Sequence, residues 1–236
     1  MSTLLQQTNA TDFLQQTNAT DFLMFAYFRV STSDNSDKIL NAAMDRAYRD
    51  AASHVLSFQD DNDKTQRNTA KETAKNIILT SLKELSKCKA SSYDDWHKKL
   101  LKELLSAYES YRFRSGYEFT YGIAQKWVNM TTKYADIILF YSKKCDKKNV
   151  DFQKQYGEMI AKYHSVFHVP IDNYVLKAAK KELDIKEEFD SSWSNINDYE
   201  KYFAFQKKIR EKTIEKGVLS PIDWECEQWI KYAKDK

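Results

Sequence analysis

Two short stretches place a reactive side chain near the start of a predicted helix. "FTYGIAQKWVNM", residues 119–130, has Gly122 just before a helical pattern and Lys126 about one turn into it. "HVPIDNYVLK", residues 168–177, contains one of only two prolines in the chain, and Asp172 follows that proline by two positions. A lysine amine can attack an electrophilic carbon, and an aspartate can accept a proton or stabilise a developing positive charge. The two stretches together suggest nucleophilic catalysis, and Lys133 is a second, weaker candidate nucleophile.

The position of each residue in its helix affects its chemistry. Proline is tolerated in the first helical turn, so Pro170 predicts a helix start, with the helix running to about residue 183 and Asp172 in its first turn. The helix dipole and the free N–H groups there favour a charged carboxylate. The same positive end, together with burial, disfavours a protonated Lys126 and makes its amine more available. The alternative interpretation is purely structural, since "SPID" at 220–223 has the same Pro-Ile-Asp order and reads as a simple helix start.

The two stretches resemble motifs of the helix-hairpin-helix DNA glycosylases of the endonuclease III type. "YGIAQKWV", residues 121–128, is similar to the hairpin Pro-Gly-Val-Gly-x-Lys-Thr-Ala, and "VPIDNYVLKAA", residues 169–179, is similar to a downstream Val-Asp-Thr-His-Val stretch. The long interval between them resembles the archaeal 8-oxoguanine glycosylase branch. The resemblance lies within residues 111–180. It implies a glycosylase, possessing or lacking AP-lyase activity, with Lys126 as catalytic lysine and Asp172 as catalytic aspartate.

The resemblance also implies a duplex DNA partner and a set of contacts with it. A glycine and free first-turn N–H groups allow close approach to a phosphate, which suggests the hairpin residues Gly122, Ile123, Ala124 and Gln125. Basic side chains expected to contact phosphates are Arg112, Arg114, Lys143 and Lys144. A base extruded from the duplex needs aromatic faces and polar groups, for which the candidates are Trp127, His168, Trp193 and Tyr199. A position in the core is the alternative for each of these four.

Composition predicts that helices position these residues. Four glycines and two prolines among 236 residues are too few for the turns of a β protein, so we expect an all-α, multi-helix globular fold. Whether it forms one body or two lobes is left open. Apolar spacing predicts helices over 37–58, 70–85, 123–142, 150–164 and 198–215. Ser92 with Asp95 predicts the start of another helix, and Gly217, Ser220 and Pro221 predict a stop followed by the start of the last one.

The chain divides into an N-terminal segment, residues 1–35, and a helical domain, residues 36–236. The segment contains a perfect tandem repeat, because "LQQTNATDF" occupies residues 5–13 and again 14–22. Two nine-residue copies are too short and too few for a solenoid. We therefore expect the helical domain, with its helix-hairpin-helix-like region at 111–180, to carry the function.

Charge and cysteine content narrow the function classes. A formal net charge of +3 disfavours a strongly basic nucleic-acid binder but is compatible with local basic patches. Three scattered cysteines form no metal-ligand pattern, so we expect no metal, no cofactor and a reducing, cytoplasmic setting. No apolar run is long enough for a membrane span. Two alternatives stay open, a non-catalytic helical nucleic-acid-binding protein and a protein–protein interaction module, and neither the target base nor the oligomeric state is indicated.

Overall fold

The computed structural model describes residues 19–52, 56–59, 63–87, 92–144, 150–186, 189 and 192–234. Within these ranges the regular structure is helical, apart from an isolated antiparallel bridge between Phe58 and Phe113. The predicted all-α, multi-helix fold is confirmed. The first repeat copy and residues 14–18 of the second lie outside the described ranges. Residues 19–28, which include the end of the second copy, form a helix.

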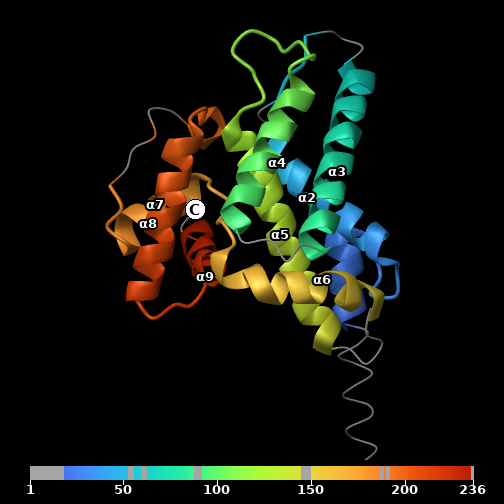
Figure 1. The fold of residues 1–236 in the computed structure, drawn as a ribbon, viewed down its shortest axis with the longest axis vertical. Helices are drawn as coiled ribbons and strands as arrows, with labels where there is room; N and C mark the ends of the chain where they lie inside the picture. The colour runs from blue at the N-terminus through green and yellow to red at the C-terminus, as the bar shows by residue number, and fades with distance from the viewer. Residues whose placement is uncertain are drawn as a thin grey trace, which may run out of the picture.

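Ten further elements follow in chain order. They are α2 (Ser36–Ala52), α3 (Asp63–Lys87), α4 (Tyr93–Tyr108), α5 (Tyr121–Lys144), α6 (Val150–Tyr163), the 3₁₀ turn η1 (His164–Val166), α7 (Asn173–Glu182), the 3₁₀ turn η2 (Trp193–Asn195), α8 (Tyr199–Glu215) and α9 (Pro221–Ala233). Helix α5 is central and packs against α2, α4, α6 and η2. Helices α7, α8 and α9 lie together on the left of Figure 1, with α3 on the other side of the molecule. In the described part of the chain, no helix has the length and apolar character needed to cross a membrane.

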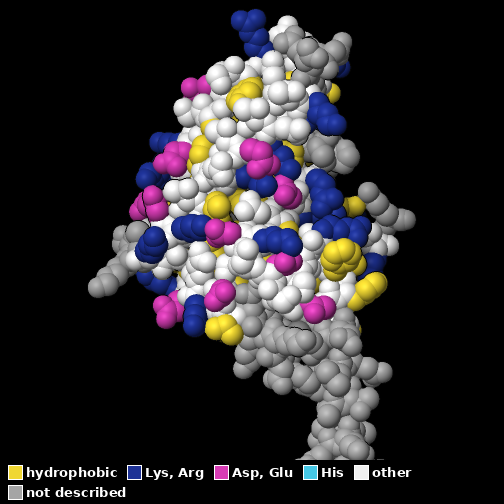
Figure 2. Space-filling view, turned by 90° about the vertical axis from the view of Figure 1, so that its right-hand side faces the viewer, with side chains coloured by type: hydrophobic (Ala, Val, Ile, Leu, Met, Phe, Trp, Pro, Cys, Tyr) yellow, Lys and Arg dark blue, Asp and Glu magenta, His cyan; other side chains and the backbone are white. Residues whose placement is uncertain are grey.

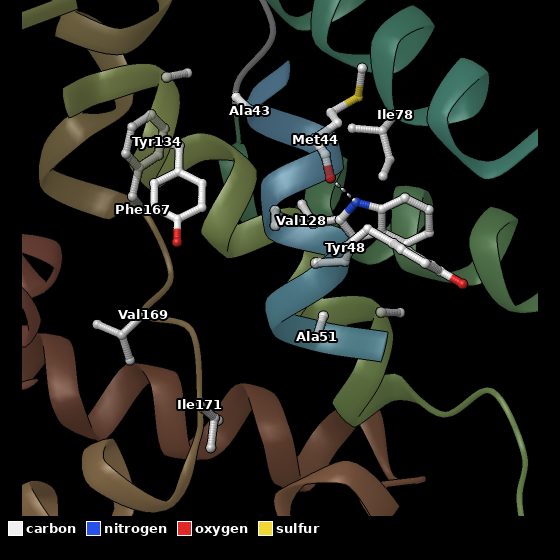
Figure 3. Packing of buried hydrophobic residues seen from close by; sticks show 14 of the residues in the cluster. Ala43, Met44, Tyr48, Ala51, Ile78, Val128, Tyr134, Phe167, Val169 and Ile171 are labelled. Carbon is white, nitrogen blue, oxygen red and sulfur yellow. Dashed lines mark hydrogen bonds between the residues drawn. The ribbon is translucent and has the colours of Figure 1, made fainter. Parts of the chain in front are cut away.

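Small residues bring α2 and α5 close together. Ala43, Ala47 and Ala51 recur every four residues on α2 and are fully buried, so the two helix backbones can approach closely. Figure 3 shows Ala43 and Ala51 on the same helix as Met44. The indole N–H of Trp127 on α5 donates to the Met44 carbonyl at 3.0 Å. The start of α5 is thereby fixed by the core.

Helix starts were predicted well where a capping signal was present, with one correction. The Ser92 side chain caps α4 by accepting the Asp95 N–H, and Pro221 opens α9 directly after Ser220. The helix predicted to start at Pro170 instead begins at Asn173, with Asp172 as its N-cap. Pro170 lies in an extended segment, residues 167–172, that precedes the helix. Proline favours this extended backbone as readily as a first helical turn.

Gly122, in the first turn of α5, allows a close contact with another part of the chain. A Cβ atom at this position would lie 1.9 Å from the Trp193 carbonyl oxygen of η2. The Gly122 N–H donates to the Ile196 carbonyl at 2.9 Å, which ties η2 to the start of α5. The glycine is therefore required by the packing of the protein on itself.

This contact predicts that Gly122→Ala lowers the free energy of unfolding by at least about 2 kcal/mol, because either η2 or α5 must move. Gly157→Ala on α6 is the matched control. Its Cβ would meet only the Leu139 Cδ1 at 3.8 Å, and alanine is the better helix former, so we expect a gain of about 0.5–1 kcal/mol. Urea unfolding of both variants measures the difference. Equal stabilities would show that the η2 contact is easily displaced.

Candidate active site

Lys126 and Asp172 meet in the folded chain. The Lys126 Nζ lies 3.4 Å from the Asp172 Oδ2, and the two side chains are only 11% and 12% exposed. Both project from helix N-termini, Lys126 from the second turn of α5 and Asp172 from the N-cap of α7. The structure therefore brings together the two residues that the sequence singled out for chemistry.

The Asp172 carboxylate is held in a fixed orientation by several donors. Its Oδ1 accepts the N–H groups of Tyr174 at 2.9 Å and Val175 at 3.0 Å, which is the capping arrangement of α7. Its Oδ2 accepts the indole N–H of Trp229 at 3.2 Å in addition to the contact with Lys126. A buried carboxylate needs such partners to compensate for lost hydration. These hydrogen bonds thereby fix the orientation of the oxygen that faces Lys126 and replace the water that it loses on burial.

The Lys126 ammonium also lies over an aromatic face. Its Nζ is 4.3 Å from the centroid of the Trp193 ring, within the range of a cation–π interaction. Trp193 belongs to η2, the turn that Gly122 allows to approach α5. One of the residues predicted to line a base pocket is therefore in contact with the candidate nucleophile.

The extended segment 167–172 is held by two glutamine side chains. The Gln125 Oε1 accepts the Ile171 N–H, and its Nε2 donates to the Ile171 carbonyl, both at 3.1 Å. Gln206 on α8 pairs with Val169 in the same way, at 3.0 Å and 2.8 Å. Pro170 lies between these two residues and has no N–H to satisfy. The segment is thus paired like a β-strand, but to side chains, and it delivers Asp172 to Lys126.

A buried polar network supports the same segment. His168 contacts the Asp94 Oδ1 through Nε2 at 3.0 Å and the Tyr202 hydroxyl through Nδ1 at 2.8 Å. Burial lowers the pKa of His168, although Asp94 opposes this effect. Hydrogen bonds from His168 and from the Arg210 guanidinium hold the pKa of Asp94 well below its usual range, despite the opposing effect of burial. His168, predicted for the base pocket, is instead a buried part of this network.

A cavity of about 600 Å³ opens beside the Lys126–Asp172 pair. Both side chains line it, and its volume falls within the range of pockets that bind small organic groups. The aromatic residues in its wall are Tyr27, Phe28, Tyr134, Tyr141, Tyr174 and Trp229. The helix at 19–28 contributes part of this wall, including Leu23 and Met24. The pair therefore faces a space in which a planar group can contact aromatic side chains.

A second lysine of the cavity wall, Lys133, is paired with Glu225, which does not itself line the cavity. The Lys133 Nζ lies 2.6 Å from the Glu225 Oε2, and the Glu225 side chain is 1% exposed. Burial would lower the pKa of Lys133, but the Glu225 charge outweighs it and raises that pKa. Burial raises the pKa of Glu225. Burial also raises the pKa of the neighbouring Cys226 thiol to about 11. Lys133 is therefore held as an ammonium ion. An ammonium ion has no free electron pair for attack, so Lys133 is a fixed cation and a poor nucleophile.

The hairpin residues predicted to bind phosphate make contacts inside the protein. The N–H groups of Ile123 and Ala124 donate to the Thr120 hydroxyl and carbonyl, and that of Gly122 to Ile196. Both Ile123 and Ala124 are buried, as is Gln125. The connection between α4 and α5 spans residues 109–120 and is not a tight hairpin. A phosphate contact at this place stays a prediction, and in this structure its donors are already engaged.

The remaining predicted residues are spread over the molecule. Trp127 and Tyr199 are buried in the core and do not line the cavity. Arg112, Arg114 and Lys143 are exposed, whereas the side chain of Lys144 lies outside the described part of the structure. The Arg114 Nε–H donates to the Phe58 carbonyl at 3.2 Å. No sequence signal pointed to Tyr174 or Trp229, because each becomes part of the site only through the packing of α7 on α9.

No family model matches the sequence, and no match was found among curated proteins or among solved structures. Among the described residues, no group of three or more His, Cys, Asp or Glu side chains is arranged to hold a metal ion. The site is therefore interpreted from its own geometry.

The glutamine pairing predicts a large cost for Gln125→Ala. The Ile171 N–H and carbonyl would both lose their partner in a buried place, which costs about 2–4 kcal/mol of the free energy of unfolding. Gln153→Ala is the control, because its amide makes a single half-buried bond to the Ser142 carbonyl at 3.3 Å. Urea unfolding measures the loss, and amide hydrogen exchange at Ile171 locates it. Losses within about 0.5 kcal/mol of each other would contradict a special role for Gln125.

His164 anchors the chain just before the extended segment and predicts a pH dependence. Hydrogen bonds to Asp136, at 3.3 Å, and to Asp223, at 3.0 Å, raise its pKa to about 9. Because the folded pKa exceeds the unfolded value of about 6.5, this stabilisation is complete below pH 6.5 and lost as the pH rises through 9.

We therefore expect His164→Gln to cost on the order of 1–2 kcal/mol at pH 6, with allowance for solvent screening, and much less at pH 9.5. Urea unfolding of both proteins at the two pH values measures this change. A cost that is the same at both pH values would show that His164 is not charged in the folded protein.

Proposed function

We propose that this protein is a DNA glycosylase that excises a damaged or modified base, with Lys126 as the nucleophile and Asp172 as its partner. The observation that carries the proposal is the 3.4 Å contact between the two side chains at the wall of an aromatic cavity of about 600 Å³. A base in a duplex must leave the stack before its glycosidic bond can be attacked, so such an enzyme needs a cavity beside its nucleophile. Aromatic walls suit a flat heterocycle.

The proposed chemistry assigns a step to each group. Asp172 accepts a proton from Lys126, and the free amine attacks C1′ of the sugar. The new C–N bond forms as the glycosidic bond breaks, and the electron pair leaves with the base. The base takes up the proton that Asp172 accepted, so Asp172 is a carboxylate again. Opening of the sugar ring then gives a Schiff base between Lys126 and C1′. The Asp172 carboxylate, whose orientation is fixed by Tyr174, Val175 and Trp229, stabilises positive charge on the sugar.

The contacts of the two lysines in the cavity support Lys126 over Lys133. Lys133 is bound at 2.6 Å to a buried carboxylate that raises its pKa. Lys126 has a longer contact with a carboxylate that already accepts three other hydrogen bonds. The Lys126 side chain is thus bound less tightly than that of Lys133 and can move more readily toward a sugar carbon.

Borohydride trapping on duplexes that carry different damaged or modified bases tests the proposal. Borohydride reduces the Schiff base to a stable amine, so we expect a covalent protein–DNA adduct with at least one substrate. Lys126→Arg keeps the cation near Asp172 and Trp193 but cannot form a Schiff base, and it should abolish the adduct. Asp172→Asn keeps the helix cap and should slow base release by about 100-fold or more. Lys102→Ala, at an exposed position on α4, is the control and should leave trapping unchanged.

Other results of the trapping experiment would each support a different function. Base release without trapping, unaffected by Lys126→Arg, would leave Asp172 as the main catalytic group and remove the lyase step. Tight duplex binding with no base release from any substrate would favour a non-catalytic nucleic-acid-binding protein. A complete lack of DNA binding at low salt would favour a protein–protein interaction module.

A further inference from the structure

Three lysines surround one tyrosine on the surface formed by α7 and α9. The Nζ atoms of Lys177, Lys181 and Lys231 lie 5.1, 5.8 and 5.5 Å from the centroid of the Tyr232 ring. All three lysines are exposed, while Tyr232 is buried beneath them. We call these three residues the lysine cluster. The ring holds three like charges close together, at distances at which each is attracted to the aromatic face.

The positive charge of the lysine cluster is only partly neutralised. Glu182 is bound to Lys231 at 2.7 Å and accepts the Tyr232 hydroxyl at the same distance. Within the described residues, no carboxylate lies within ion-pair distance of Lys177 or Lys181. Two exposed ammonium groups are therefore available to an anionic partner.

The lysine cluster lies directly next to the mouth of the cavity. Tyr174 and Trp229 both line the cavity, and their rings meet edge to face at 5.5 Å. Lys177 follows Tyr174 by three residues on α7, and Tyr232 follows Trp229 by three residues on α9. Residues three apart share a helix face and are about 4.5 Å apart along the axis. On both helices, the lysine cluster and Tyr232 thus lie about one turn beyond the residues that line the cavity.

The predicted hairpin offers less to a polyanion than the lysine cluster does. The N–H groups of the predicted hairpin are bonded inside the protein. On the face shown in Figure 2, Lys and Arg side chains alternate with Asp and Glu side chains over the centre, and several Lys and Arg side chains gather toward the right-hand side. The cluster on α7 and α9 combines uncompensated charge with closeness to the candidate nucleophile.

We propose that the lysine cluster binds the backbone phosphates of the DNA duplex whose base enters the cavity. This inference rests on the proposed function. Phosphates bind lysines as point charges and release counterions when neutralised, so such a contact positions the strand without reading its sequence. Lys177 and Lys181 would hold the strand beside Trp229, which is 39% exposed at the cavity mouth. The target nucleotide would then have a short path to Lys126.

The salt dependence of duplex binding tests this assignment. Affinity for an unmodified duplex is measured over a range of salt concentrations with Lys177→Ala/Lys181→Ala and with wild type. Each phosphate contact contributes about 0.9 to the slope of log K against log salt, so the double variant should reduce the slope by about 1.8. Lys102→Ala/Lys154→Ala removes two exposed charges from α4 and α6 and is the control, which should keep the wild-type slope.

The outcomes separate this inference from the proposed function. If the α7 variant keeps the wild-type slope, or the control loses as much, the lysine cluster is not the phosphate site even when trapping at Lys126 succeeds. If the slope falls as expected while the trapped adduct still forms at saturating DNA, both proposals are supported. A wild-type protein that binds no duplex at low salt overturns both.

Discussion

An extended backbone that crosses a helical core must find hydrogen-bond partners for its polar groups, and the rest of the site depends on how this is done. Within the described part of the chain, no strand lies beside residues 167–172. Gln125 and Gln206 take its place, each pairing both backbone groups of one residue, Ile171 or Val169. Unpaired, these buried groups would cost about 1–3 kcal/mol each. This pairing fixes where the segment ends, and so where α7 begins and where Asp172 presents its carboxylate.

The electrostatics of the cavity follow from that placement. Lys126, Asp172 and Lys133 line the cavity, and Glu225 is buried against Lys133, so two lysine–carboxylate pairs lie at this place. Taking such charges out of water is costly, and apolar residues in their place would often give a protein that is no less stable. Stability alone is therefore a weak reason for two such pairs at one cavity. The two pairs differ in environment. Glu225 lies 2.6 Å from Lys133, whereas the Asp172 carboxylate is shared among Lys126, Trp229 and the first amides of α7. This difference is the reason why we propose Lys126, and not Lys133, as the nucleophile.

Local signals in the sequence predicted much of the fold and of the site. They could not predict contacts between segments that are distant in the sequence. The helix starts marked by the N-cap Ser92 and by Pro221 depend on adjacent residues and were predicted correctly. The hypothesis that Lys126 and Asp172 act together rested on two local motifs, and the structure places them in contact. Gln125 was predicted to face DNA, and it lies inside because its amide matches a backbone 46 positions away. Likewise, Trp229 reaches Asp172 only through the packing of α9 on α7, for which no pattern in the sequence exists.

The most direct test of the central claim is a crystal structure of the protein bound to a duplex with a cationic pyrrolidine in place of one sugar. Such an analogue mimics the charge that develops at C1′ during base release. The proposed chemistry predicts the pyrrolidine in the cavity, with its nitrogen beside the Asp172 carboxylate and with Lys126 on the reacting face. A duplex bound elsewhere, with no atom of the DNA in contact with Lys126 or Asp172, would contradict a catalytic role for the pair.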